Sequence, residues 1–306
     1  MSTEIVLTLF AALLGGALKV SVPFLFVSLG ETLTERSGRV NLGLEGIMVF
    51  GAMVGYAVSF HSNNAWLGVL AAGLAGACFG ALHAGLCSLP RVNDTAIGIA
   101  LMIFGLGLAF LFGKAYIQPT APRLTDIALG GFASNPAVQA ALRINIMLPI
   151  GIACAFAMHW ALKNTRWGLM LHTVGDSQNA ARALGFNITR IRVIATALGG
   201  VFAGIGGAFL SLYYPGSWNE ALSSGQGIMA IALVIFARWQ PLGCLWAAMI
   251  FGGASSIGPA LQSVGIQQGY QLWNAAPYVL TLAVMLISSS SNSGASGAPG
   301  ELSLTR

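Results

Sequence analysis

Long apolar runs separated by short polar intervals fill most of this sequence. A helix needs about 20 mainly apolar residues to cross the hydrocarbon core of a bilayer. Nine stretches reach or approach that length, of which the seventh is short and the first contains Lys19 and Pro23. The pattern therefore predicts an all-α polytopic membrane protein with about 8–10 transmembrane helices, some of them short or broken. The predicted helices cover about residues 5–30, 43–60, 65–89, 95–113, 145–162, 191–212, 221–237, 242–262 and 271–289.

Composition supports a chain that is embedded in lipid. Of the 306 residues, 56% are hydrophobic and only 8% are charged, whereas soluble proteins carry about 25% charged residues. No interval is long and charged enough for a separate soluble domain, so residues 1–289 are expected to form a single transmembrane domain. The segment 290–306 is of low complexity, with Ser and Gly prominent, and is expected to be a disordered tail.

The basic residues lie in the gaps between apolar runs, mainly on one side of the membrane. Cytoplasmic loops of membrane proteins carry an excess of Lys and Arg. If the interval 163–192 is cytoplasmic, alternation of the predicted helices places ten basic residues inside and three outside. The N-terminus is then outside and the C-terminus is cytoplasmic. The residues inside are Arg36, Arg39, Arg91, Lys163, Arg166, Arg182, Arg190, Arg192, Arg238 and Arg306, and those outside are Lys114, Arg123 and Arg143.

Glycine accounts for 40 of the 306 residues, and much of it recurs at intervals of four. Such spacing lets the backbones of membrane helices approach closely, so most of these glycines are expected to serve helix packing. The pairs are Gly51/Gly55, Gly76/Gly80 and Gly200/Gly204. The run 223–227 is different, because its glycines alternate with polar side chains. Non-helical backbone at membrane depth is tolerated only where it is buried in protein or lines a watery cavity.

Asn41 and Glu45 are the sharpest candidates for a polar pathway, since polar groups within apolar runs are costly and usually functional. In one interpretation they hydrogen-bond a polar solute, or hold a broken helix that surrounds it. In the other, Glu45 pairs with Arg36 or Arg39 at the membrane surface. The sequence leaves both open.

Other polar residues near apolar runs have weaker support. Gln226 and Asn274 are further candidates to line a pathway. Trp218 could stack on a solute at the outer entrance, although a membrane anchor at the interface is the favoured interpretation for a Trp in this position. Glu31 and Glu35 are expected to belong to a solvated cluster at the membrane surface.

The polar interval 163–192 contains the pattern of a short helix. Asp176 can cap its N-terminus. Ala180, Ala181 and Leu184 are spaced to lie on one helix face, and Gly185 offers a place for the chain to turn. From the residues alone, this can also be a solvated helix within a connecting loop.

Two motifs resemble those of permeases from ABC importers. Gly175, Ala181 and Gly185 match the Gly-x5-Ala-x3-Gly pattern of the EAA-type cytoplasmic loop. The sequence ERSGRVNLGLEG at 35–46 is similar to the branched-chain amino acid, ribose and nucleoside group of permeases, and most similar to its nucleoside and simple-sugar subgroup. The resemblance extends over about residues 20–285.

The resemblance implies the transmembrane subunit of an importer in the bacterial cytoplasmic (inner) membrane, forming half of the pathway for a nucleoside-like or related small polar solute. It also implies several partners: a second permease subunit, paralogous and non-identical, two ATP-binding subunits, an external solute-binding protein and the lipid bilayer, but no nucleic acid. In that family the loop holds the helix that couples to the ATPase. The matching residues are Gly175, Asp176, Ala180, Ala181, Leu184 and Gly185.

No catalytic, cofactor or metal motif was found, so the chain is expected to be non-catalytic. Gly107 and the Gly113-Lys114-Ala115 sequence fail the P-loop pattern, because five residues intervene instead of four and Ala115 replaces the required Ser or Thr. The alternative function is a self-sufficient secondary carrier or channel. Coupling to an ion gradient would require acidic or ion-coordinating groups near mid-membrane, for which Glu45 is the candidate.

Overall fold

The computed structural model describes residues 3–129, 131, 136–266, 268–290 and 297–304. Helices dominate the described residues, which confirms the prediction of an all-α polytopic membrane protein. The exception is one small antiparallel ribbon, in which Ile127 faces Ile144. The elements are α1 (Thr3–Arg36), α2 (Leu44–Ser62), α3 (Ala65–Leu86), α4 (Asp94–Gly113), η1 (Lys114–Tyr116), β1 (Asp126–Ala128), α5 (Pro136–Ala141), β2 (Arg143–Asn145), α6 (Met147–Asn164), α7 (Arg166–Asp176), α8 (Gln178–Ala183), α9 (Ile188–Leu212), α10 (Gln226–Phe236), α11 (Pro241–Ser263), α12 (Tyr270–Asn274), α13 (Ala276–Ser290) and α14 (Gly300–Leu304).

Each predicted transmembrane stretch contains a helix. Among the described residues, six helices are long and apolar enough to cross a membrane, namely α1, α2, α3, α4, α9 and α11, while α10 and α13 are apolar but shorter. Two predicted boundaries were wrong. Helix α1 continues through Pro23 to Arg36 without a break, and the seventh stretch is helical only from Gln226, which leaves an 11-residue helix.

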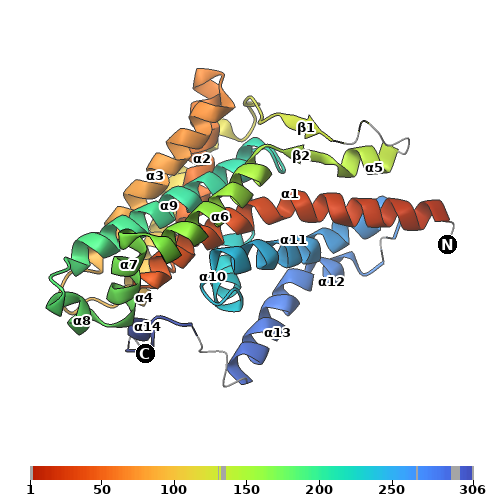
Figure 1. The fold of residues 1–306 in the computed structure, drawn as a ribbon. Coiled ribbons are helices and arrows are strands. Elements are labelled where there is room, and N and C mark those ends of the chain that lie inside the picture. The colour runs from red at the N-terminus through yellow and green to blue at the C-terminus, as the bar shows by residue number, and fades with distance from the viewer. Residues whose placement is uncertain (1–2, 130, 132–135, 267, 291–296, 305–306) are drawn as a thin grey trace.

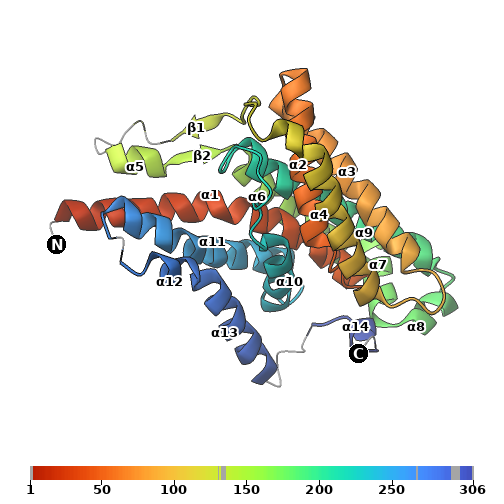
Figure 2. The same ribbon diagram turned by 180° about the vertical axis from the view of Figure 1, so that it is seen from behind.

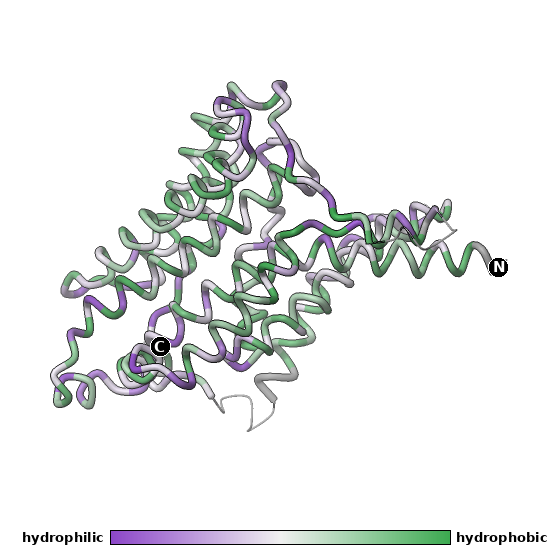
Figure 3. Tube along the Cα trace, turned by 45° about the horizontal axis from the view of Figure 1, so that its top comes forward, coloured by the Kyte–Doolittle hydropathy of each residue, from purple (hydrophilic) through white to green (hydrophobic). Residues whose placement is uncertain are grey.

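The helices form two groups that meet along α1 (Figures 1 and 2). Helices α2, α3, α4 and α9 lie side by side, and α3 makes its most extensive contact with α9. On its other side α1 packs against α11, with α6, α7 and α10 completing a second core that includes Phe24, Leu171 and Phe251. Hydrophobic residues follow the helices, and hydrophilic stretches occur mainly at their connections (Figure 3).

Glycine permits the close contact between α3 and α9. A Cβ atom added to Gly76 would lie 2.0 Å from the carbonyl oxygen of Gly200, and one added to Gly204 would lie 2.1 Å from that of Ala72. Gly204 also faces Gly51 of α2, since a Cβ added to Gly51 would lie 2.6 Å from the Cα of Gly204. The packing interpretation of these small-residue pairs is confirmed, because the backbones touch where no side chain fits.

Part of the expected disordered tail, residues 290–306, is helical in the structure, whereas residues 291–296 and 305–306 lie outside the described residues. Residues 300–304 form α14, which lies beside α7 and α8 at the opposite end of the molecule from the β1–β2 ribbon (Figure 1). Glu301, the only acidic residue of the tail, accepts a hydrogen bond of 2.9 Å from the Gln178 backbone N–H and another from the Gln178 side-chain amide. The low-complexity composition concealed this contact, although Ala298 and Leu302 also pack against the second core.

We expect Gly200→Val to destabilise the α3–α9 contact strongly, because overpacking alone costs about 1–3 kcal/mol and here the neighbour is backbone that cannot rotate away. The measurement is the thermal unfolding midpoint of the purified protein in detergent. Gly107→Ala is the matched control, since nothing lies within 4 Å of its added Cβ. Equal midpoints for the two variants would contradict this packing.

Candidate functional site

The chain between α9 and α10 forms no helix, and buried residues such as Trp218 and Ser223 alternate in it with exposed ones such as Glu220. It leaves α9 at the end of α4, where Trp218 packs so closely on Gly113 that an added Cβ would lie 2.4 Å from the indole Nε1. It then runs back to the first turn of α2, where Gly225 and Gly227 contact Glu45. Residues 213–225 therefore connect the end of α4 with the first turn of α2 before α10 begins.

The carboxylate of Glu45 caps the N-terminus of α10. Its Oε2 accepts a hydrogen bond of 2.7 Å from the Gly227 N–H, and its Oε1 accepts one of 3.0 Å from the Gly225 N–H and another from the Ser223 hydroxyl. Glu45 is 6% exposed. The first N–H groups of a helix have no intrahelical partner, and the positive end of the helix dipole favours an anion. Of the two interpretations, the structure supports Glu45 holding a broken helix.

The other interpretation, in which Glu45 pairs with Arg36 or Arg39, does not hold in the structure, because both arginines bind elsewhere. Arg36 donates a hydrogen bond of 3.0 Å to the Trp239 carbonyl and lies 3.1 Å from Nδ1 of His172. Burial, together with the charge of Arg36, lowers the pKa of His172, which leaves the imidazole neutral and able to accept from Arg36. Arg39 forms an ion pair of 3.0 Å with Asp94.

Glu31 and Glu35 do not form the expected solvated cluster, since both are buried. Glu31 accepts a hydrogen bond of 2.8 Å from the Asn41 backbone N–H. Glu35 accepts one from the indole N–H of Trp239. Sequence reasoning missed Trp239, which closes over the polar end of α1 from a chain position about 200 residues away.

Of the proposed pathway residues, Asn41 and Gln226 lie close to Glu45, whereas Trp218 and Asn274 lie away from it. Asn41 orders the turn into α2 by accepting a hydrogen bond of 2.9 Å from the Gly43 N–H, and Gln226 lies between the two glycines held by Glu45. The Asn41 Nδ2 and Gln226 Oε1 atoms are buried and have no partner within the described residues. Trp218 lies apart and is 1% exposed, so it is not an interfacial anchor. Asn274, at the end of α12, contacts Gly258 instead.

Helix α8 is capped by Ser177 and not, as expected, by Asp176. The Ser177 hydroxyl accepts from the Ala180 N–H at 3.3 Å, and its backbone is extended, with φ −157°, as a capping residue requires. Asp176 is still the last residue of α7. Gly185 ends the α8 turn with φ +77°, as predicted.

Gly175 lets α7 pack directly against the end of α1. A Cβ added to Gly175 would lie 2.1 Å from the Arg36 carbonyl oxygen.

Ala180, Ala181 and Leu184 do not share one face of α8, contrary to the sequence prediction. Ala181 is fully buried against the second core, whereas Leu184 is 63% exposed and Ala180 is exposed. The helix is therefore held to the molecule by Ala181 and presents Ala180 and Leu184 outward.

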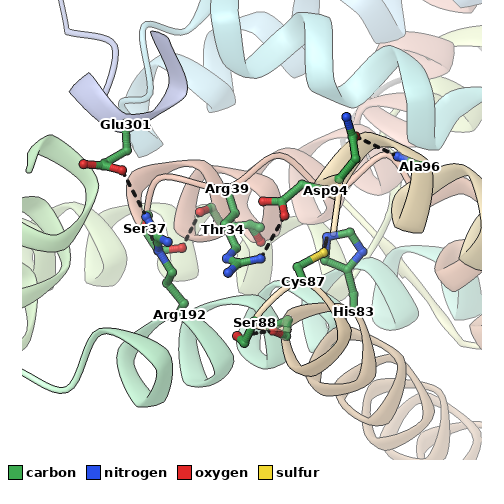
Figure 4. A network of polar contacts seen from close by, with 12 residues as sticks. Thr34, Ser37, Arg39, His83, Cys87, Ser88, Asp94, Ala96, Arg192 and Glu301 are labelled. Carbon is green, nitrogen blue, oxygen red and sulfur yellow. Dashed lines mark hydrogen bonds and ion pairs between the residues drawn. The ribbon is translucent and has the colours of Figure 1, made fainter. Parts of the chain in front are cut away.

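A polar network ties this region to three long helices (Figure 4). Arg192, near the start of α9, donates a hydrogen bond of 3.0 Å to the Ser37 carbonyl and lies 3.7 Å from the Glu301 carboxylate. Arg39, just beyond α1, binds Asp94 at the start of α4. The ends of α1, α4 and α9 are thus connected, and α8 contacts the same network through Glu301.

Comparisons with known proteins agree with this architecture. The profile of the family described as "Branched-chain amino acid transport system / permease component" matches residues 13–289. The guanosine ABC transporter permease protein NupQ of Bacillus subtilis is 30% identical, over 92% of this chain and 92% of that protein. The putative glucose ABC transporter permease protein TsgC13 of Haloferax volcanii is 30% identical, over 90% and 91%. The nucleoside ABC transporter permease protein NupC of Lactococcus lactis is 29% identical, over 87% and 89%.

We expect Glu45→Gln to loosen the start of α10, because an amide offers one acceptor where the carboxylate serves three donors. Hydrogen bonds to charged groups contribute about 1.5–3 kcal/mol. Hydrogen exchange of the backbone amides at 225–229 should therefore be about ten times faster or more. Glu220→Gln removes an exposed charge from the same connection and is the control. Unchanged exchange in Glu45→Gln would show that the cap does not hold the helix.

Proposed function

This chain belongs to the permease family of branched-chain amino acid transport systems, and we propose that it is the transmembrane subunit of an ATP-driven importer in a bacterial cytoplasmic membrane. It forms half of a translocation pathway, and a second, non-identical permease subunit forms the other half. The chain itself is non-catalytic, since ATP is hydrolysed by two cytosolic subunits. The outward-facing Leu184 of α8 is the observation that carries this proposal.

The contacts of α8 are those expected of a coupling helix that transmits movement to the long helices. A short helix that moved independently of the long helices could not transfer movement to a pathway. Helix α8 is instead joined to α7 and α9 through the buried Ala181, and α7 is seated on the end of α1 at Gly175. A push on the exposed face is therefore passed to α1, which spans the length of the molecule (Figure 2). Gly175, Asp176, Ala180, Ala181, Leu184 and Gly185 are proposed to serve this coupling.

We assign the pathway to the surroundings of the break between α9 and α10. Broken helices whose ends meet near mid-membrane are a recurrent way of building solute sites in transporters. Asn41 and Gln226 offer uncharged donors and acceptors there, and the charge of Glu45 is already satisfied by protein N–H groups. Such groups suit a neutral solute with many hydroxyl or amide groups. A nucleoside or a sugar, the solutes in the names of the relatives, has this chemistry.

The state of Glu45 also weighs against a self-sufficient carrier. An ion-coupled carrier needs a group that gains and loses its ion during each cycle. The carboxylate of Glu45 is committed to Ser223, Gly225 and Gly227, so releasing it would unravel the start of α10.

An external solute-binding protein is proposed to deliver the solute at the other end of the molecule. The β1–β2 ribbon and α5 project there, far from α8 (Figure 1). This orientation places α8 and the C-terminus in the cytoplasm, consistent with the predicted distribution of basic residues.

We expect Leu184→Ser to lower solute-stimulated ATP hydrolysis and uptake by about tenfold or more, because it removes apolar area from the docking face while leaving the core intact. The assay uses the complete importer in proteoliposomes, with a set of nucleosides and sugars. Leu169→Ser is the matched control, since Leu169 of α7 is 64% exposed and Leu184 is 63% exposed, and it should change the rates less than about twofold.

An equal loss in both variants would show that docking is not specific to α8.

The chain reconstituted alone in liposomes should show no gradient-driven uptake. Robust uptake by the chain alone would overturn the importer-subunit assignment in favour of a carrier.

A further inference from the structure

A cleft of about 310 Å³ opens beside α8, between the start of α9 and the connections that follow α1 and α3. It differs from the pathway in position and in chemistry, because its lining is dominated by cationic and hydroxyl-bearing side chains. The side chains used below are those of Arg39, Ser88, Arg182, Asn187, Thr189 and Arg192.

Three arginines converge on this cleft, and the charge around them is incompletely balanced. Arg39 is paired with Asp94 at 3.0 Å, and Arg192 lies 3.7 Å from Glu301. Arg182 is exposed and forms no ion pair with any described residue. The cleft therefore carries an excess of one positive charge, and like charges held together favour a bound anion.

Arg39 supplies a second, independent observation. Its side chain is 8% exposed, and only the NH1 group is used by Asp94. The Nε atom is buried and has no partner within the described residues. A buried guanidinium N–H without an acceptor is costly, so the charge of Arg39, whose side chain lines the cleft, is only partly compensated by Asp94.

The beginning of α9 adds neutral donors. Asn187, Ile188 and Thr189 line the cleft, and the Asn187 side-chain oxygen is already used by the Arg190 N–H. The other N–H groups of a first helical turn lack intrahelical partners, and together with the helix dipole they attract phosphate. The hydroxyls of Ser88 and Thr189 complete a donor-rich lining.

We propose that this cleft binds a phosphate group, carried either by a soluble phosphate ester or by the headgroup of an anionic lipid. Arginine forks match phosphate oxygens in geometry and charge. A volume of about 310 Å³ exceeds that of a single ion and leaves room for the rest of the ester. Because Arg182 lies on α8 and Arg192 on α9, the bound phosphate bridges the docking helix and a long helix. The site stands on this geometry and not on the importer assignment.

The test uses inorganic pyrophosphate as the probe, titrated by calorimetry into the purified chain in a neutral detergent. We expect Arg182→Gln to weaken binding by about tenfold or more, the effect of losing one charge-assisted contact. Arg190→Gln is the matched control, because Arg190 is an exposed arginine in the first turn of α9 that does not line the cleft. It should change the affinity less than about twofold. No binding, or equal weakening in both variants, overturns the proposal.

A lipid arm identifies the source of the phosphate. Pyrophosphate binding is compared in nanodiscs of phosphatidylcholine and in nanodiscs containing phosphatidylglycerol. Inhibition by phosphatidylglycerol that Arg182→Gln abolishes supports a lipid headgroup, whereas equal binding in both membranes supports a soluble ester. If the ATP-binding subunits displace pyrophosphate and Arg182→Gln weakens their assembly, the cleft is a subunit interface and the proposal is overturned.

Discussion

The need to satisfy buried backbone groups governs this structure. In lipid no water is available to bind an open N–H or C=O group, so a chain can leave the helical state only where protein supplies the partners. Glu45 supplies them for α10 by accepting from the Gly225 and Gly227 N–H groups. The end of the non-helical segment 213–225 can therefore be buried against α2, although Pro215, Asn219 and Glu220 within it are exposed. The 11-residue length of α10 follows from the same contact, because the carboxylate fixes where that helix starts.

The end of α1 connects the two regions proposed to be functional. On one side the Arg36 carbonyl lies against Gly175 of α7, and on the other the Arg36 side chain binds the Trp239 carbonyl just after α10. Glu35 binds the indole of the same tryptophan. Helix α10 is thus attached to α1 at its C-terminal end and to α2, through Glu45, at its N-terminal end. A displacement of α1 relative to α2 would therefore act on α10 at both ends. Gln226, whose side-chain oxygen has no partner among the described residues, lies at the N-terminal one.

Properties that depend on local pattern were predictable from the sequence, and those that depend on distant partners were not. Apolar runs located the long helices, and the spacing of Gly76, Gly200 and Gly204 indicated close packing, because both signals come from neighbouring positions. The partner of Glu45 lies about 180 residues away, and a carboxylate in a sequence does not reveal whether it will meet a guanidinium or a helix end. The cap of α8 was misplaced by one residue for a local reason, since Asp and Ser are equally good caps.

The docking of α14 has a practical consequence for anyone who handles this protein. Glu301 is held against Gln178 beside the exposed face of α8. A purification tag or fluorescent fusion placed directly after α14 would start next to the surface proposed to meet the ATPase and would crowd it. Engineered extensions are better placed at the N-terminus, which lies at the far end of α1 (Figure 1).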